Sequence, residues 1–396
     1  MLQLRSLIPI RRRWSTPPSY HLLHGLQESK KSCREMDPEI WKRLPVEILD
    51  RILSFLPLNN FLRLRSTCKH FYALVFSPVF LLMHASRFPD HSCFSSFLLL
   101  SHPQLYHMLR LYDFEIGSWK DVPLLLTRFP TSKVSSSVNL LSSSNGLLCF
   151  ANSSSFLVCN ALTMSLRVIQ FPHFPFTFES FNFISTPSCY KILVLRSRHA
   201  SDSNLSLVYE SKTNSWTKFS GTGLTMGANL LQDGVFFKGA FYFTTVEPFA
   251  VVSFHVTKGK WEEQGSELPP LLTFARLVAD GDEKLRLVGG VGRNGISRSI
   301  RVWELSREGR RWIEVERLPE PMCRKLLTVC YHYYDHVYCF WHQGMICLCC
   351  YNWPEILYYH VGRRIWRWLP RCPALPEKWS CGFKWFSFSP QIFSLA

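Results

Sequence analysis

The chain has 396 residues, more than one compact core usually accommodates, so we expect several domains or a circular array of repeats. Hydrophobic residues make up 47% of it and aromatic residues 15%, which excludes an intrinsically disordered protein. The formal net charge of +16 favours acidic partners in general, because a positive field concentrates nucleic acid, anionic membrane and acidic protein alike.

The fourteen cysteines are scattered without an even framework. The first 35 residues lack the apolar stretch and small-residue cleavage site of a secretory signal. We therefore predict reduced thiols and a location in the nucleus, the cytoplasm or both. No apolar run approaches the roughly 18 residues that span a bilayer, so we predict a soluble protein without a membrane partner.

Basic residues are concentrated only in the N-terminal arm, residues 1–36, which includes Arg11, Arg12 and Arg13. This arm could address the protein to the nucleus or to an organelle, or it could be an extension upstream of an alternative start at Met36. A solvated, disordered tail is the interpretation that we favour.

Residues 37–85 carry apolar side chains at three- and four-residue spacing, which predicts a module of three short helices. The first helix is expected to begin at Pro45 and to end before Pro57, because a proline inside a helix loses a backbone hydrogen bond and clashes with the preceding turn. Its apolar stripe consists of Ile48, Leu49, Ile52, Leu53 and Leu56.

The apolar stripe is larger than so small a module can bury by itself. A segment of fewer than about 50 residues forms a marginal core without metal, disulfide or partner, and no zinc-binding spacing is present in it. Each exposed leucine or isoleucine would forgo about 1.5–3 kcal/mol of burial. The surplus therefore predicts a partner protein that covers the stripe.

The order of these residues resembles a known family. The pattern LP-x-EIL-x-x-IL-x-x-LP followed by LRLRSTCKHF is similar to an F-box, and the lead-in IWKRLP resembles the plant F-box/kelch-repeat group. The resemblance implies a surface that binds the Skp adaptor of a cullin-RING ubiquitin ligase. Carried over position by position, this surface comprises Leu44, Pro45, Ile48, Leu49, Ile52, Leu53, Leu56, Leu62, Leu64 and Cys68.

Two positions depart from the family pattern. Thr67 stands where valine is frequent, and Phe71 stands where tryptophan is frequent; both keep similar bulk. The alternative interpretation is an ordinary helical bundle that caps the following domain.

Residues 86–104 read as a linker, and from about residue 100 helical spacing gives way to short β-rich runs between polar turns. A strand, a turn and an aromatic residue recur. Equivalent positions are assigned to Trp119, Val168, Trp216, Trp261, Trp312 and Trp366, which gives steps of 49, 48, 45, 51 and 54 residues. This spacing is typical of kelch repeats.

The repeats predict a mainly β fold, in which a kelch-like six-bladed β-propeller over residues 105–396 follows the small helical module. The leftover C-terminal segment SCGFKWFSFSP has strand character, and we expect it to pair with the first unit and close the ring. The region resembles the plant F-box-associated β domains, which implies the same architecture.

Two kinds of chemistry are suggested by local motifs. Gly289–Gly295 contains G-x-G-x-x-G, but β-branched alternation follows it, which indicates a hairpin and not a nucleotide site. No C-x-x-C pair occurs within the cluster of metal-ligand residues, and its members alternate between the faces of strands, so no metal is predicted. That cluster consists of Cys330, His332, His336, Cys339, His342, Cys347, Cys349 and Cys350.

Together these features predict a substrate-recognition subunit of a Skp-cullin-F-box ubiquitin ligase, without cofactor or catalytic residue of its own. The partners implied are the Skp adaptor, through it cullin and a RING protein, and an unidentified target on the propeller. Nucleic acid is not expected, because Arg307, Arg310 and Arg311 are interspersed with glutamates. An interaction scaffold or transcriptional co-regulator outside ubiquitin transfer is the alternative, and a kelch-type copper oxidase is a third.

Overall fold

The structure is a computed structural model of the whole chain, which divides into two compact units, Met1–Leu49 and Asp50–Ala396. The predicted N-terminal arm lies outside the residues that it describes. None of the helices among the described residues is both long and apolar enough to cross a membrane. The described residues are 43–56, 60–61, 64, 67–75, 77–87, 96–105, 108–123, 138–163, 165–173, 176–186, 189–196, 205–220, 232–245, 248–330, 334–375, 378–391 and 394.

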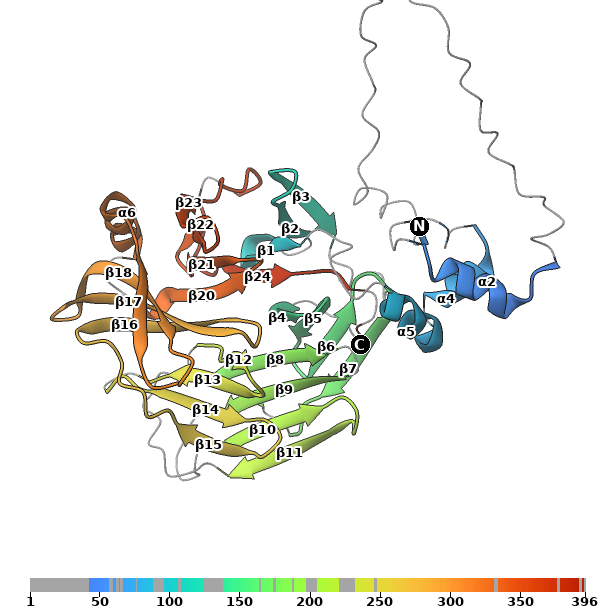
Figure 1. Cartoon of the computed structure of the whole chain (residues 1–396), viewed down its shortest axis with the longest axis horizontal. Helices are drawn as coiled ribbons and strands as arrows, with labels where there is room; N and C mark the ends of the chain where they lie inside the picture. The colour runs from blue at the N-terminus through green and yellow to red at the C-terminus, as the bar shows by residue number, and fades with distance from the viewer. Residues whose placement is uncertain are drawn as a thin grey trace, which may run out of the picture. The chain divides into compact units, whose positions relative to one another are not determined.

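The helical module contains α2 (Val46–Leu53), α4 (Lys69–Leu74) and α5 (Pro78–Arg87) (Figure 1). Asn60, Phe61 and Leu64 are also helical, as expected for a short helix between α2 and α4. The linker predicted over residues 86–104 is shorter in the structure, because α5 continues to Arg87 and the first strand begins at Phe97.

Six four-stranded antiparallel sheets follow, and they form the blades of a propeller (Figure 1). Blade 1 contains β1 (Phe97–Ser101), β2 (Met108–Asp113), β3 (Ser118–Pro123) and β24 (Lys384–Phe388). Blade 2 contains β4 (Asn139–Ser144), β5 (Leu147–Ala151), β6 (Ser155–Asn160) and β7 (Ser165–Gln170). Blade 3 contains β8 (Ser180–Thr186), β9 (Cys189–Arg196), β10 (Leu205–Glu210) and β11 (Ser215–Ser220).

The remaining blades have the same strand order. Blade 4 contains β12 (Val235–Phe237), β13 (Ala240–Thr244), β14 (Val251–His255) and β15 (Lys260–Glu263). Blade 5 contains β16 (Leu272–Asp280), β17 (Lys284–Arg293), β18 (Ile296–Leu305) and β19 (Trp312–Arg317). Blade 6 contains β20 (Val337–His342), β21 (Met345–Cys350), β22 (Trp353–His360) and β23 (Ile365–Trp368).

The hydrophobic core is divided among the spaces between blades. Six clusters of buried residues each combine side chains from two successive blades, and one of them joins blade 6 to blade 1. Each sheet is therefore covered on both faces by its neighbours, which is the condition for a ring of sheets to be stable. The prediction of a mainly β, six-bladed propeller is confirmed.

The C-terminal segment closes the ring. β24 pairs antiparallel with β1, with Phe97 opposite Phe388 and Leu100 opposite Trp385. This strand lies within the C-terminal segment SCGFKWFSFSP, which is left over from the six repeat units predicted from the sequence. By pairing with β1 it covers an edge that would otherwise offer unsatisfied backbone groups to other chains.

Blade 6 is also joined to β24 through side chains. The Tyr338 hydroxyl accepts a hydrogen bond from the backbone N–H of Trp385 at 2.8 Å and donates one to the carbonyl of Phe383 at 3.1 Å. His342 Nδ1 lies 2.8 Å from the Ser387 hydroxyl oxygen. These contacts join blade 6 to the strand that closes blade 1, across 45 to 47 residues of the chain.

The repeating tryptophans stand at the start of the outermost strand in five blades. In blade 2 the position predicted for the repeat, Val168, is wrong. Val168 is the fourth residue of β7 and is 43% exposed. Leu166 is the equivalent of the tryptophans: it pairs with Cys159 as Trp216 pairs with Tyr209, and it packs against the core between blades 1 and 2. The corrected steps are 47 residues from Trp119 to Leu166 and 50 from Leu166 to Trp216. In blade 2 an aliphatic residue therefore occupies the position that tryptophan has in the other blades.

Most of these tryptophans hydrogen-bond to the preceding part of the ring. The Nε1 atoms of Trp216, Trp261 and Trp312 donate to Gln170 O, Ser206 Oγ and Ser266 Oγ, each at 3.2 Å. Trp119 Nε1 donates across the closure to Pro370 O at 3.1 Å. The indole therefore supplies both apolar area and a directional link between blades.

The turn that precedes the outermost strand is also repeated. Two residues before the repeated tryptophan of their blade stand Gly117, Asn214, Gly259 and Arg364, each with a positive φ between 51° and 67°. Glycine adopts this left-handed backbone without penalty, whereas arginine costs about 1–2 kcal/mol there. Arg364 is thus retained at a position where it lowers stability.

The glycine-rich segment forms the turn of the β17–β18 hairpin. Asn294 (φ 53°) and Gly295 (φ 72°) occupy its tip, as an Asn-Gly hairpin turn requires. A Cβ atom on Gly292 would lie 1.7 Å from the carbonyl oxygen of Ile296, so only glycine fits. The hairpin interpretation of this motif agrees with the observed strands.

The helix α6 (Glu320–Cys330) between β19 and β20 was not expected from the strand-rich pattern. Its buried residues, Cys323, Leu326, Leu327 and Cys330, recur at helical spacing and pack into the core between blades 5 and 6. Pro319 precedes it and accepts a hydrogen bond from Cys323 N at 2.9 Å. The spacing was present in the sequence, but the surrounding β signal obscured it.

We expect Trp261→Phe to lower the free energy of unfolding by about 1 kcal/mol more than Trp366→Phe does. Both indoles are buried. Trp261 Nε1 donates to Ser206 Oγ, whereas Trp366 Nε1 has no partner among the described residues. Urea denaturation of the two variants measures the difference, and equal losses would show that the hydrogen bond contributes nothing.

Stability should also depend on the protonation of His342. Burial lowers the pKa of this histidine to about 4 from an ordinary value of 6.5, so between these values the unfolded chain binds more protons than the folded one. The contribution of neutral His342 to stability is fully present above the unfolded pKa and is lost as the pH falls toward the folded one.

From pH 7 to pH 5, protonation of this residue should lower the free energy of unfolding by about 2 kcal/mol. Urea denaturation at the two pH values, with His342→Gln as the variant that does not titrate, provides the measurement. The variant should lose less stability on acidification than the parent; parallel losses would contradict the assignment.

Candidate partner-binding surface

The helix α2 and the turn that follows it present apolar side chains to solvent. Val46 and Phe55 are each 53% exposed, Ile48 is 44% exposed and Ile52 is 37% exposed. Ile48 and Ile52 are four residues apart, so they lie on one face of the helix. Large apolar residues exposed in succession mark an interaction surface more often than isolated ones do.

Other residues of the module form a small core of their own. Leu53, Phe61, Leu74, Val75, Phe80 and Leu81 are buried. The rings of Phe61 and Phe80 pack with their centroids 4.7 Å apart. His84 is buried beside them, and its Nε2 lies 2.9 Å from the carbonyl oxygen of Leu56. Burial lowers the pKa of His84, which favours the neutral ring at neutral pH.

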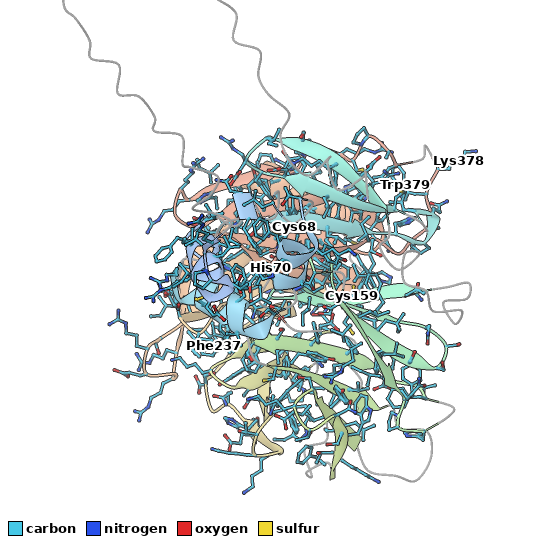
Figure 2. All side chains as sticks on the ribbon, turned by 90° about the vertical axis from the view of Figure 1, so that its right-hand side faces the viewer. Cys68, His70, Cys159, Phe237, Lys378 and Trp379 are labelled. Carbon is cyan, nitrogen blue, oxygen red and sulfur yellow. The ribbon has the colours of Figure 1, made fainter. Side chains whose placement is uncertain are left out.

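Capping side chains define where the helices begin. Cys68 Sγ accepts a hydrogen bond from Phe71 N at 3.4 Å, and Ser77 Oγ accepts one from Phe80 N at 3.3 Å. His70 Nε2 lies 2.7 Å from Asp50 Oδ1, which links α4 to α2. Cys68 and His70 therefore have structural roles in this region (Figure 2).

The structure assigns different environments to the residues predicted from the family resemblance. Pro45, Ile48, Ile52 and Cys68 are exposed, and Leu44, Leu49, Leu56 and Leu64 are half-buried. Leu53 is buried and contributes to the internal core. Leu62 lies outside the described residues.

Five exposed apolar residues were absent from that predicted set. They are Val46, Phe55, Tyr72, Val79 and Leu82. Val79 and Leu82 are three residues apart on α5 and are the most exposed large apolar residues of the chain's described part. Their helical spacing was readable in the sequence, but periodicity alone does not tell which face of a helix is covered.

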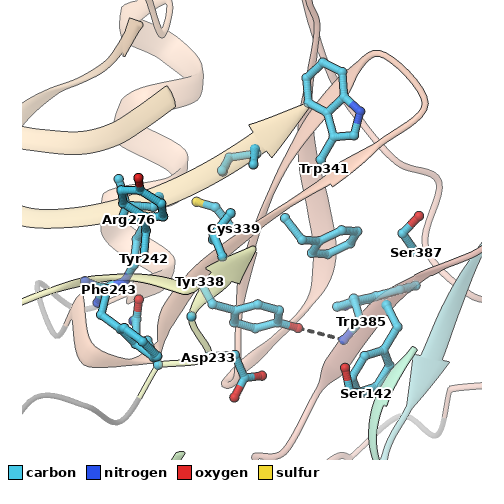
Figure 3. Close-up of a pocket in the computed structure, with 18 of the residues that line it drawn as sticks. Ser142, Asp233, Tyr242, Phe243, Arg276, Tyr338, Cys339, Trp341, Trp385 and Ser387 are labelled. Carbon is cyan, nitrogen blue, oxygen red and sulfur yellow. Dashed lines mark hydrogen bonds between the residues drawn. The ribbon is translucent and has the colours of Figure 1, made fainter. Parts of the chain in front are cut away.

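The propeller has a separate cavity of about 270 Å³ at the centre of the ring. It is lined from the inner strands β4, β16, β20 and β24, from β13 and from the segment that leads into β12 (Figure 3). Eight of the residues that line it are aromatic. They are Tyr242, Phe243, Tyr338, Phe340, Trp341, Tyr351, Trp385 and Phe386.

Two charged residues in this cavity have shifted pKa values. Burial raises the pKa of Asp233 to about 6, and the nearby Lys384 opposes the rise. Burial lowers the pKa of Arg276 to about 10. Arg276 uses its donors on backbone carbonyls, with Nε to Val337 O at 2.5 Å and Nη2 to Tyr334 O at 2.5 Å, and so it holds the walls together.

The cysteine and histidine cluster of blade 6 does not converge. Cys347 and Cys349 face the core between blades 6 and 1, whereas Cys350 faces the core between blades 5 and 6. Burial raises the pKa of Cys339 to about 12, which keeps its thiol protonated. The described residues include no group of three His, Cys, Asp or Glu that could hold a metal ion. His332 lies outside them.

Comparison with known proteins identifies both parts of the chain. Residues 97–364 match the F-box associated beta propeller domain, and residues 41–85 match the F-box-like family. An F-box/kelch-repeat protein of Arabidopsis thaliana is 48% identical over 372 residues, which cover 91% of this chain and 90% of that protein.

More distant relatives also match most of the chain. The Arabidopsis protein UNUSUAL FLORAL ORGANS is 26% identical over 370 residues, covering 85% of this chain and 80% of that protein. The Arabidopsis SKP1-interacting partner 15 is 24% identical over 317 residues, covering 71% of this chain and 81% of that protein. An F-box-like helical segment followed by an F-box-associated propeller, matched over most of its length, places this chain in the F-box/kelch-repeat family.

Proposed function

We propose that the protein is the substrate-recognition subunit of a Skp-cullin-F-box ubiquitin ligase. The observation that carries this proposal is the exposed apolar surface formed by Ile48 and Ile52 on one face of α2 and by Phe55 in the turn after it, in a segment that matches the F-box-like family. A helix face of this kind is covered when it docks into the groove of a partner protein. The name of one relative, SKP1-interacting partner 15, supports a Skp-type adaptor as that partner.

The division of labour follows from the two kinds of structure. The helical segment tethers the chain to the ligase, and the propeller holds the target near the ligase's catalytic partner. The rate of ubiquitin transfer then increases through proximity, because a tethered reaction replaces an encounter between free molecules. The chain itself supplies binding and not catalysis.

The chemistry of the side chains is consistent with this role. Every described cysteine is a free thiol, and most are buried, which supports a location in the nucleus or cytoplasm, where thiols stay reduced.

Substituting Ile48 and Ile52 together by aspartate should abolish co-purification with a Skp-type adaptor, because two charges would have to be buried in the interface without partners. Loss of at least a hundredfold in affinity is expected. Val168→Asp is the matched control, since Val168 on the propeller is 43% exposed and Ile48 is 44% exposed.

Circular dichroism should show that both variants keep their strand content. If the Ile48→Asp, Ile52→Asp protein still co-purifies with the adaptor, the proposed tether is wrong, and a scaffold that uses this surface for another partner becomes the better interpretation.

A further inference from the structure

A series of basic residues marks the outer turns of four consecutive blades. In each blade the turn between the third and fourth strands leads into the outermost strand, and blades 3, 4, 5 and 6 all carry exposed cations at or next to this turn. These cations are Lys212, Lys258, Lys260, Arg307, Arg310, Arg311, Arg363 and Arg364. We call them the basic arc.

The topology places the arc on one side of the ring. The inner strands β4, β8, β12, β16, β20 and β24 are the ones that contact their counterparts in neighbouring blades. The fourth strands therefore lie at the periphery, and the turns that precede them emerge on the same face, because all six sheets have the same strand order. The cations follow successive blades along this rim.

The arc is interrupted in blades 1 and 2. The corresponding turn of blade 1, Phe114–Gly117, carries Glu115 in place of a cation. The described part of the blade 2 turn, residues 161–163, has no charged residue. The arc therefore belongs to blades 3 to 6 only and is not a feature of every repeat.

The arginines of the arc are not neutralised by the glutamates that are near them in sequence. Glu304 pairs with Lys284 and Arg286, and Glu314 pairs with Arg301 and Arg317. Glu316 accepts a hydrogen bond from the Tyr359 hydroxyl at 2.8 Å.

None of the eight arc cations forms an ion pair with a carboxylate of the described residues. Within the four turns Glu308 is the single acidic residue. The arc therefore carries an uncompensated positive field, which attracts negatively charged partners.

The backbone of one arc residue supports a functional role. Arg364 has φ 53° at the turn position where Asn214 and Gly259 stand in blades 3 and 4. An arginine there is strained, and backbone strain of this kind clusters at ligand-binding sites in proteins.

Exposed apolar residues accompany the arc. Ile313 and Val315 lie on β19 directly after the arginines of blade 5, and Ile365 lies on β23 directly after Arg364. These side chains would make no favourable contact with a phosphate backbone, and the described residues next to them include no exposed aromatic side chain that could stack on bases. Alternating acidic and apolar side chains of an extended peptide would satisfy both kinds of residue.

We propose that the basic arc is the target-docking surface of the propeller and that it binds an extended, acidic segment with apolar residues in the target protein. This inference deepens the proposed function, since it names the chemical class of target that the ligase subunit would recruit. Binding to the arc is independent of the adaptor, so the two proposals can fail separately.

The test uses the full chain without any adaptor. A fluorescein-labelled peptide of eight Glu-Glu-Leu repeats serves as the probe, a peptide with glutamine in place of glutamate is its neutral control, and a DNA duplex of the same total charge is the nucleic-acid competitor. Fluorescence anisotropy at two salt concentrations measures affinity. The acidic peptide should bind, and its affinity should fall as salt increases.

Two charge-reversal variants locate the site. The arc variant carries Arg310→Glu, Arg311→Glu and Arg363→Glu. The control variant carries Arg293→Glu, Arg298→Glu and Lys378→Glu, which are exposed cations outside the arc and change the net charge equally. Affinity for the acidic peptide should fall at least tenfold in the arc variant and less than twofold in the control.

Equal losses in both variants, or no binding of the acidic peptide by the parent chain, would overturn the proposal. Tighter binding of the duplex than of the peptide, dependent on the same arginines, would assign the arc to nucleic acid instead. Arg364→Gly provides a second readout: it should raise the melting temperature by about 1–3 °C and weaken peptide binding. If Arg364 had only a structural role, the substitution would change the melting temperature without changing peptide affinity.

Discussion

The packing of each blade against its neighbours is the interaction on which the rest of the structure depends. A four-stranded sheet with two apolar faces is stable in water only when both faces are covered, and in this chain six clusters of buried side chains provide that cover. The ring must therefore close. β24, from the end of the chain, completes blade 1, and His342 with Ser387 and Tyr338 with Trp385 hold the closure from the side of blade 6.

Closure of the ring explains why the turns between strands can carry charged residues without loss of the fold. Since the blades obtain their stability from buried faces, the turns between strands contribute little to it and can carry charge, as Arg310 and Arg363 do. The same rigidity keeps these turns at constant positions relative to one another, which a surface for an extended partner requires. The helical segment has the opposite property: its own core is small, and part of its apolar surface stays exposed.

Much of the fold was predictable because local patterns are strong. Proline positions and three- to four-residue spacing indicated α2, and a tryptophan near the start of successive outer strands indicated a repeat of about 50 residues. Register was predictable to a lesser degree: Val168 was assigned where Leu166 stands, because one aliphatic residue resembles another until strand pairing is known. The helix α6 was missed because eleven residues of helical spacing lie between strongly β-forming segments.

The sequence by itself determined the class of both parts, the number of blades and the segment of the chain that is rich enough in exposed apolar residues to need a partner. These depend on periodicity, which is a property of neighbouring residues. Only the tertiary structure decided that Leu53 is internal while Ile52 is exposed, and that Glu304 and Glu314 are paired elsewhere and leave the arginines of blade 5 unneutralised. Burial and charge pairing join residues that are distant in the chain, so they are set by packing and cannot be read from local spacing.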